Sequence, residues 1–212
     1  MSANPQLLPL NPARQRIHAA AMKLFAERGV TKINISDLAT ASGMARGTIY
    51  SHVPDIDTLF EQVAAQLAHE MTERVVAGFA GVDDPARRLS IGVRQFIRRA
   101  CEEPLWGRFI SRFGLSEAVL REVLSSAPMA DLLAGIDSGR YRIGREQALA
   151  MAGLLAGGTL AAMLPVLDGH RTWRDIGSDV VELMLTSLGL ERGEAKTLAR
   201  GELPALADPT RS

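Results

Sequence analysis

One arginine, Arg46, stands at the start of a short predicted helix over residues 46–52. Its planar guanidinium group can donate two parallel hydrogen bonds to the edge of a guanine, and it suits a phosphate oxygen equally well. In a helix that enters the major groove of DNA, the first residues face the bases. The base contacts of such a helix would therefore come from Met44, Ala45, Arg46 and Gly47.

Enzymatic chemistry has little support in the sequence. The four histidines have no metal-ligand spacing, and the segment HEMTE at residues 69–73 has a glutamate where a zinc-protease helix needs its second histidine. Neither a glycine-rich phosphate loop nor a nucleophile elbow is present. We therefore expect no enzyme, no cofactor and no metal site.

The single cysteine, Cys101, excludes an intramolecular disulfide and indicates a reducing compartment. It is a redox sensor or, as we favour, a buried inert thiol.

Two short helices joined by a tight turn must position the residues around Arg46. Asn34 can cap a helix over residues 35–42, and Gly43 ends it because glycine enters the left-handed conformation at little cost. A small side chain at Ala39 lets the second helix, 46–52, cross closely, and Ile49 fills the angle between the two. This spacing of an alanine, a glycine and a branched apolar residue is typical of a helix-turn-helix motif.

The flanks of the motif extend the pattern. An amphipathic helix over residues 13–28 precedes it, and a new helix start at residues 54–60 follows it. The segments LFAERG and ISDLATASGMARGTIYSHV and the downstream LF resemble, throughout residues 13–60, the DNA-binding domain of the TetR family of transcriptional regulators. The resemblance implies an all-α homodimer, with an N-terminal three-helix helix-turn-helix domain and a larger C-terminal helical domain that binds a ligand and dimerises.

The resemblance also implies phosphate contacts from the motif. Thr48, Tyr50 and His52 are similar to family positions that donate hydrogen bonds to phosphates, although the Tyr50 ring suits a purely structural role as well. Ser36, near the start of the first motif helix, is a further candidate for a phosphate contact.

One position departs from the family pattern. Where many relatives have a lysine, this chain has Ile56, which cannot bind a phosphate. A helix start near residues 55–58 would still offer backbone N–H groups to a phosphate, but two aspartates in that turn oppose the contact. We expect Lys32 or the region of Arg14 and Arg16 to compensate.

Composition favours helices and gives no general attraction for DNA. The chain has 212 residues, of which 47% are hydrophobic and 5% aromatic, and its net charge is zero. Residues 11–60 contain six basic and four acidic residues, a modest excess for a DNA-binding domain. DNA affinity must therefore also depend on dimerisation, backbone amides and hydroxyls. The N-terminus lacks the pattern of a signal peptide, so we expect a cytoplasmic protein.

Apolar residues at helical spacing predict a C-terminal domain made of helices. The first, Asp55–Phe79, is long enough to connect both domains and is a candidate lever. Further helices are predicted over residues 87–101, 105–113, 116–124, 129–136, 148–167, 173–190 and 191–200. The expected domains are a flexible arm (1–12), the DNA-binding domain (13–60), the ligand-binding and dimerisation domain (61–200) and a flexible tail (201–212).

The segment Ala148–Leu167 has no charge over twenty residues, which is long enough to span a bilayer. It is rich in Ala and Gly, and Pro165 is expected to break it. A helix that is apolar all round also suits a core position with one face in a subunit interface. We expect this segment and Trp173–Leu190 to form a four-helix dimer interface, with no membrane contact.

By resemblance, the effector pocket lies among the helices between Met71 and Met163. Arg94, Arg98 and Arg99 suit an acidic ligand but fit a solvated helix face better. Six apolar side chains are candidate lining residues, although each also fits a plain core position: Phe96, Trp106, Phe109, Phe113, Met129 and Met163.

Together these features predict a sequence-specific DNA-binding regulator, most simply a repressor that a small, largely apolar effector releases from a palindromic operator in double-stranded DNA. Its two recognition helices must lie about 34–36 Å apart to enter successive major grooves. One alternative is a helical interaction protein whose DNA-binding surface has weakened, as Ile56 and the low local charge suggest. The other is an enzyme that acts on the occupant of the pocket.

Overall fold

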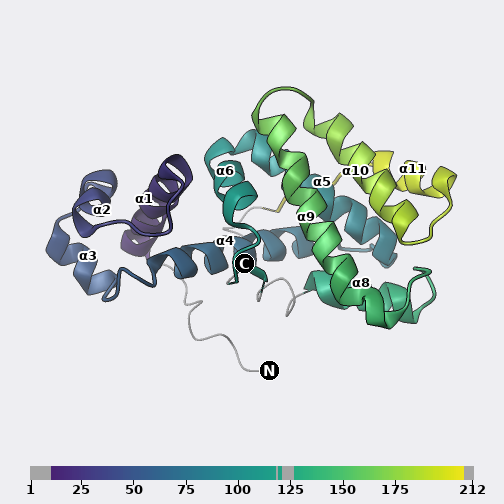
Figure 1. Ribbon diagram of the computed structural model, residues 1–212, viewed down its shortest axis with the longest axis horizontal. Coiled ribbons are helices and arrows are strands. Elements are labelled where there is room, and N and C mark those ends of the chain that lie inside the picture. Colours follow the sequence, from purple (N-terminus) through teal and green to yellow (C-terminus); the bar gives the residue numbers. More distant parts are fainter. Residues whose placement is uncertain (1–10, 118, 121–126, 208–212) are drawn as a thin grey trace.

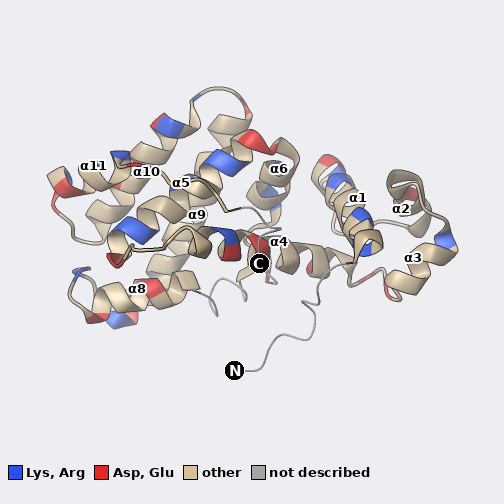
Figure 2. Cartoon of the chain, turned by 180° about the vertical axis from the view of Figure 1, so that it is seen from behind, with Lys and Arg blue, Asp and Glu red and all other residues tan. Residues whose placement is uncertain are grey.

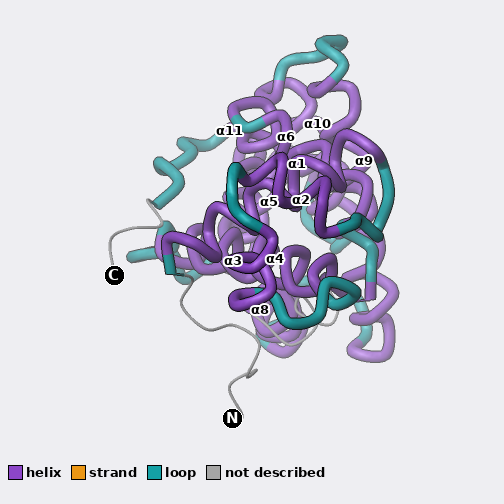
Figure 3. Tube along the Cα trace, turned by 90° about the vertical axis from the view of Figure 1, so that its left-hand side faces the viewer, coloured by secondary structure: helices purple, strands orange, loops and turns teal. Residues whose placement is uncertain are grey.

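The computed structural model describes residues 11–117, 119–120 and 127–207, and all regular structure within these residues is helical (Figures 1 and 3). The N-terminal helices are α1 (Pro12–Arg28), α2 (Ile35–Ser42) and α3 (Arg46–His52), and α4 (Leu59–Ala77) follows. The C-terminal domain contains α5 (Pro85–Glu102), α6 (Pro104–Phe113), α8 (Ala127–Asp137), a short 3₁₀ turn (Arg145–Gln147), α9 (Ala148–Leu167), α10 (Trp173–Ser187) and α11 (Arg192–Arg200).

Local capping sets both ends of α2. The side chain of Asn34 accepts the N–H of Asp37 at the start of α2, and Gly43 ends that helix at φ = 65°. Leu38 and Ile49 are fully buried where α2 and α3 meet. The helix bounds predicted for the motif, 35–42 and 46–52, match the structure.

Helix α4 begins at Leu59, four residues later than the predicted start at Asp55. The carboxylate of Asp55 accepts the N–H of Asp57, and the hydroxyl of Thr58 donates to the carbonyl of Asp55. These bonds form a compact turn in place of a first helical turn. From Leu59 the helix runs out of the N-terminal domain and along the C-terminal one (Figure 1).

In the C-terminal domain, α5 lies at the centre and packs against α6, α9 and α10 (Figure 1).

Helix α9 continues through Pro165 to Leu167, so the predicted break at this proline was wrong. Pro165 stands in the last turn of the helix, where a missing N–H removes only one late hydrogen bond. Helix α10 ends at Ser187, before Gly189 at φ = 91°. Part of the predicted helix 116–124 lies outside the described residues.

The segment after α11 is held against the helices, which corrects the expected flexible tail for residues 201–207. Arg94 donates to the carbonyl of Gly201 at 2.7 Å, and Gln95 donates to the carbonyl of Pro204. On α4, Arg74 donates to the carbonyl of Ala207 at 2.7 Å. Residues 208–212 of the expected tail and 1–10 of the expected arm lie outside the described residues.

The two domains share one hydrophobic core. Buried residues form a continuous cluster from Ile17 in α1 to Ala199 in α11. At the junction, an aromatic cluster brings together one ring from α1, one from α4 and two from α6, with neighbouring ring centroids 5.0–6.4 Å apart: Phe25, Phe60, Phe109 and Phe113. Helix α1 therefore packs directly onto α6 of the C-terminal domain.

Candidate functional site

The outer face of α3 is a small polar surface on a rigid support. Ile49 is fully buried beneath it, whereas Tyr50 is 54% exposed. Arg46, Gly47 and Thr48, the other predicted contact residues on this face, are exposed as well. Ala45 is exposed at the helix start, and a half-buried group completes the predicted set: Ser36, Met44 and His52.

Arg46 differs from the other cations of the N-terminal domain. Residues 11–60 are all described, and within them Lys23, Arg28 and Lys32 each pair with a carboxylate. Arg14 and Arg16 donate hydrogen bonds to backbone carbonyls. The side chain of Arg46 makes no ion pair or hydrogen bond within this range, and Figure 2 shows basic positions on α1 and at α3. Its donors are therefore available to an external acceptor.

Arg14 and Arg16 have a structural role that their sequence positions did not predict. The Nε of Arg14 donates to the carbonyl of His52 at 3.2 Å, at the end of α3. A terminal nitrogen of Arg16 donates to the carbonyl of Ser42 at 2.9 Å, at the end of α2. Because both bonds start from α1 and end on C-terminal carbonyls, they fix the angle at which α2 and α3 leave the domain.

The predicted phosphate site at residues 55–58 is not formed as a helix start. Helix α4 begins later, at Leu59, and Asp55 already accepts the N–H of Asp57. Ile56 is half-buried and packs against the core. The Nζ of Lys32 lies 3.8 Å from the carboxylate of Asp57, so its charge is partly neutralised in this structure.

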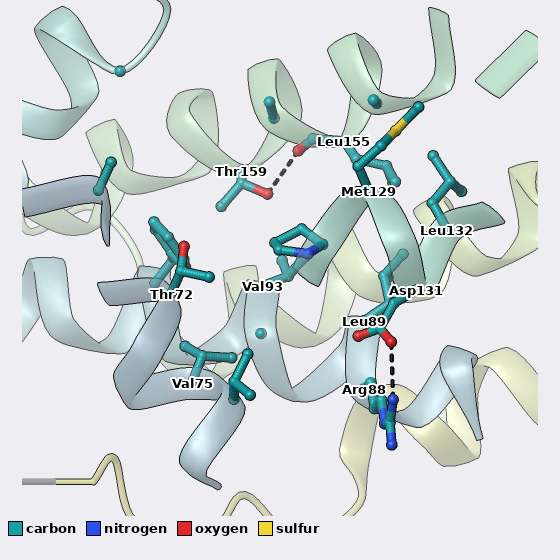
Figure 4. Close-up of a pocket in the computed structure, with 18 of the residues that line it drawn as sticks. Thr72, Val75, Arg88, Leu89, Val93, Met129, Asp131, Leu132, Leu155 and Thr159 are labelled. Atoms are coloured by element: carbon teal, nitrogen blue, oxygen red, sulfur yellow. Dashed lines mark hydrogen bonds and ion pairs between the residues drawn. The ribbon is translucent and has the colours of Figure 1, made fainter. Parts of the chain in front are cut away.

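A cavity of about 190 Å³ lies within the C-terminal domain, among α4, α5, α6, α8 and α9 (Figure 4). Of the six predicted lining residues, Phe96 and Met129 lie at the cavity. The other four, Trp106, Phe109, Phe113 and Met163, do not line it. Phe109 and Phe113 belong to the aromatic cluster, Met163 is fully buried, and the Trp106 ring packs under the guanidinium of Arg99 at 4.5 Å.

Few polar groups reach the wall of the cavity. Arg88 and Asp131 form an ion pair at 2.9 Å, and Arg88 also donates to the carbonyl of Val82. The Thr159 hydroxyl donates to the carbonyl of Leu155 at 2.7 Å. Thr72 and Tyr141 complete the polar set, and burial raises the pKa of the Tyr141 phenol. None of these polar residues was predicted from the sequence, where the polar candidates were Arg94, Arg98 and Arg99.

Helix α4 belongs to both functional regions. Its C-terminal half lines the cavity through Ala68, Thr72 and Val75. Its first residues, Leu59 and Phe60, are buried in the core shared with α1. On the same helix, Glu70 pairs with the buried Arg99 of α5 at 3.1 Å and with Arg74 at 3.2 Å. A molecule in the cavity would therefore contact an element that also supports the N-terminal domain.

An apolar stripe remains exposed on α9 and α10, which pack side by side (Figure 1). Leu149 is 63% exposed, Leu154 67%, Leu164 51% and, on α10, Leu183 70%. A Cβ added at Gly153 or Gly157 would meet no atom within 4 Å. Among the described residues, Arg145–Leu167 is the one helical stretch long and apolar enough to cross a membrane. In the single chain, only 28% of its most apolar 18 residues are buried.

No group of histidine, cysteine and carboxylate side chains suited to a metal ion occurs within the described part of the chain. Cys101 is exposed, which corrects the expectation of a buried thiol.

Comparisons with known proteins agree with this arrangement. Residues 17–63 match the family described as bacterial regulatory proteins, tetR family, and residues 84–201 match the tetracyclin repressor-like C-terminal domain. The chain is 38% identical over 50 residues to the transcriptional regulator AcrR of Shigella flexneri, which is 24% of this chain and 23% of AcrR. It is 42% identical over 64 residues to a transcriptional repressor of Mycobacterium tuberculosis, covering 30% of this chain and 32% of the repressor. The matched segments thus span about a third or less of these two curated relatives.

Solved structures match over nearly the whole chain. RolR in complex with resorcinol superimposes with a TM-score of 0.71 and 27% identity, covering 92% of this chain and 96% of that one. A putative regulator from Shewanella has a TM-score of 0.72 at 20% identity, over 84% of this chain and 98% of that one, and shows the fold alone.

Proposed function

We propose that this chain, which belongs to the TetR family of transcriptional regulators, is a homodimeric repressor that leaves its operator when a small apolar molecule enters the C-terminal cavity. The observation that carries the proposal is the dual role of α4. Its C-terminal half lines the cavity, and its first turn is buried beside α1. Regulators of this family are not enzymes, and they act as DNA-binding dimers. The cytoplasm is the proposed location.

The DNA contacts proposed for this chain are those of the motif. Residues 13–60 form the DNA-binding domain, and α3 enters the major groove with its first residues toward the bases. Arg46 is the proposed base contact, because the structure leaves its donors free. The remaining proposed contacts follow from the sequence: Ser36, Met44, Ala45, Gly47, Thr48, Tyr50 and His52.

Dimerisation through α9 and α10 would cover the exposed apolar stripe. A two-fold axis there would place two copies of α3 on one molecule, and a spacing of about 34–36 Å between them would suit successive major grooves. Residues 61–200 form the proposed ligand-binding and dimerisation domain. Burial of the stripe between two subunits also explains why α9 is so apolar, without a membrane.

The proposed switch acts through α4. This helix has 19 residues and so is about 28 Å long. A small tilt of the helix at the cavity would therefore displace its first turn. A molecule that binds the non-operator state more tightly by about 5.5 kcal/mol would give a near-complete switch. The resorcinol complex of RolR supports a small ligand for a chain of this fold.

DNA fragments selected from a genomic library by the purified protein test this function. The wild-type chain should enrich a palindrome, and fluorescence anisotropy should then show tight binding to it. Arg46→Ala should weaken binding about 5- to 150-fold and relax specificity at one base pair per half-site. Lys23→Ala, which removes an exposed cation already paired with Glu27, is the matched control.

Two results would contradict these assignments. If Arg46→Ala weakens binding uniformly over all sequences and lowers the salt slope by about one, Arg46 binds a phosphate and not a base. If the wild-type chain enriches no sequence at any ionic strength, the chain is an interaction module whose DNA-binding surface has weakened.

A further inference from the structure

The wall of the C-terminal cavity is specific enough to define a class of ligand. The inference rests on the proposed function, since it concerns the molecule that would release the repressor. It depends on three properties of the cavity, which are its volume, its charge and the hydrogen-bonding capacity left at its wall.

The volume limits the ligand to about one ring. The cavity measures about 190 Å³. An apolar cavity of roughly 150 Å³ in another protein binds benzene, so this one accommodates a benzene ring with a few substituents. The wall is formed almost wholly by apolar side chains, such as Val75, Leu89, Val93 and Leu155, which suits the faces of an aromatic ring (Figure 4).

The charge of the wall excludes ionic ligands. The only charged side chains at the cavity among the described residues are Arg88 and Asp131, and they pair with each other at 2.9 Å. Arg88 also donates its Nε to the carbonyl of Val82 at 2.6 Å. A bound carboxylate or ammonium would thus find no unpaired counter-charge, and burying a charge without a partner is strongly unfavourable.

Two polar side chains of the wall, Thr159 and Asp131, each keep a free acceptor. The hydroxyl hydrogen of Thr159 is donated to the carbonyl of Leu155, so its oxygen is left to accept. Asp131 accepts Arg88 at Oδ1, and no partner of its Oδ2 is recorded among the described residues. Figure 4 shows Thr159 and Thr72 on one side of the cavity and Asp131 with Arg88 on the other. Two acceptors on separate sides call for a ligand that carries donors at its edge.

We propose that the effector is a neutral aromatic ring with hydroxyl groups, of the phenol or benzenediol class, whose hydroxyls donate to Asp131 and Thr159. The apolar walls hold the ring, and the two acceptors discriminate it from a plain hydrocarbon. Discrimination arises because a ligand without donors leaves both acceptors without the water they would otherwise bind.

Isothermal titration calorimetry on the full chain tests this class with four probes, namely resorcinol, phenol, toluene and benzoate. Resorcinol and phenol should bind, toluene should bind at least ten-fold more weakly than resorcinol, and benzoate should give no heat. Thr159→Val should weaken resorcinol about 5- to 10-fold and leave toluene unchanged. Thr197→Val is the matched control, since Thr197 makes the same bond to its i−4 carbonyl on the exposed helix α11.

A second variant tests the charge argument independently. Asp131→Asn leaves Arg88 without its carboxylate, so benzoate should gain measurable affinity while resorcinol loses it. Asp179→Asn, which removes the partner of Arg171 on exposed surface, is the control. Benzoate binding to the wild-type chain, equal affinities for toluene and resorcinol, or no binding of either phenol would overturn the proposal.

DNA release, measured by anisotropy with the same probes, separates this inference from the proposed function. A phenol that binds the cavity but leaves the operator complex intact refutes the switch and supports the ligand class. Release by a charged molecule that competes for the cavity refutes the ligand class and supports the switch.

Discussion

Nothing in the described fold requires a glycine at Gly47. It lies inside α3 with no positive φ, and a Cβ added there would meet no atom within 4 Å. A glycine in a helix costs roughly 0.5–1 kcal/mol relative to alanine. The proposed approach of a DNA backbone or base edge to this residue gives a reason for that cost.

Gly47→Ala should therefore separate stability from function. We expect the free energy of unfolding to rise by about 0.5–1 kcal/mol, measured with urea, while operator affinity falls ten-fold or more. Gly193→Ala is the matched control, because Gly193 is also helical, exposed and free of neighbours within 4 Å. The Gly193→Ala variant should raise the free energy of unfolding and leave DNA binding unchanged. Unchanged operator affinity in Gly47→Ala would show that nothing approaches this position closely.

His18 makes the stability of the protein depend on pH. Burial, aided by the positive charge of Arg14, lowers the pKa of His18 from 6.5 to about 4. The unfolded chain then binds a proton between these values when the folded one does not, so stability falls as pH drops from 6.5 toward 4. At pH 5 the loss amounts to about 2 kcal/mol relative to pH 7.

Urea unfolding at pH 7 and pH 5 checks the role of His18. His18→Leu should lose less stability over this interval than the wild type, by about 2 kcal/mol. His170→Leu alters an exposed loop residue and should behave as the wild type does. Equal losses in all three chains would assign the pH dependence to other groups.

At the level of the helices, α4 is held at both of its ends. Its first turn lies in the aromatic cluster through Phe60, and Arg74 near its other end binds the carbonyl of Ala207 in the C-terminal segment. The same segment covers Arg94 and Gln95 of α5, whose side chains are buried. Residues 201–207 therefore connect α5 with the proposed lever.

Removal of residues 201–212 should destabilise the protein. Arg94 and Gln95 would lose the carbonyls of Gly201 and Pro204, and the free energy of unfolding should fall on the order of 3 kcal/mol. Chemical denaturation gives the measurement. Glu202→Gln, which leaves every backbone carbonyl in place, should unfold as the wild type does. A truncated chain with the wild-type midpoint would mean that this segment adds no net stability.

The elements that sequence reasoning located correctly are those whose ends are set locally. Asn34 and Gly43 cap α2 through bonds within a few residues, and the predicted bounds are those of the structure. The start of α4 was misplaced because the Asp55 side chain forms a turn instead of a helix cap. The cavity forms where five helices meet, and the spacing of residues within one helix does not show how the helices meet. The sequence therefore could not distinguish Phe96, which lines the cavity, from Trp106, which does not.

For the whole molecule, the exposed stripe on α9 and α10 sets the proposed assembly. Its leucines would be paired across a two-fold axis in the dimer, and a charge placed there would be buried without a partner. DNA affinity should depend strongly on this contact, because two linked half-sites gain about 10²–10⁴ over one.

Leu154→Glu or Leu183→Glu should give a monomer in analytical ultracentrifugation and weaken operator binding by about 10²-fold or more. Each monomer should keep its helical circular dichroism spectrum. Leu115→Glu is the control, since Leu115 is 54% exposed and lies outside both helices. If the two variants sediment as the wild type does, the subunits meet through another surface.

The aromatic cluster between the domains has a consequence for protein engineering. Phe25 and Phe60 pack against Phe109 and Phe113 of α6, so the core of the operator-binding part continues into α6. A fragment cut after residue 60 would expose these rings to water and should aggregate. A chimera that joins α1–α3 to another sensor domain must therefore also carry matching aromatic rings from α6, because the rings of the N-terminal part would otherwise be exposed to water.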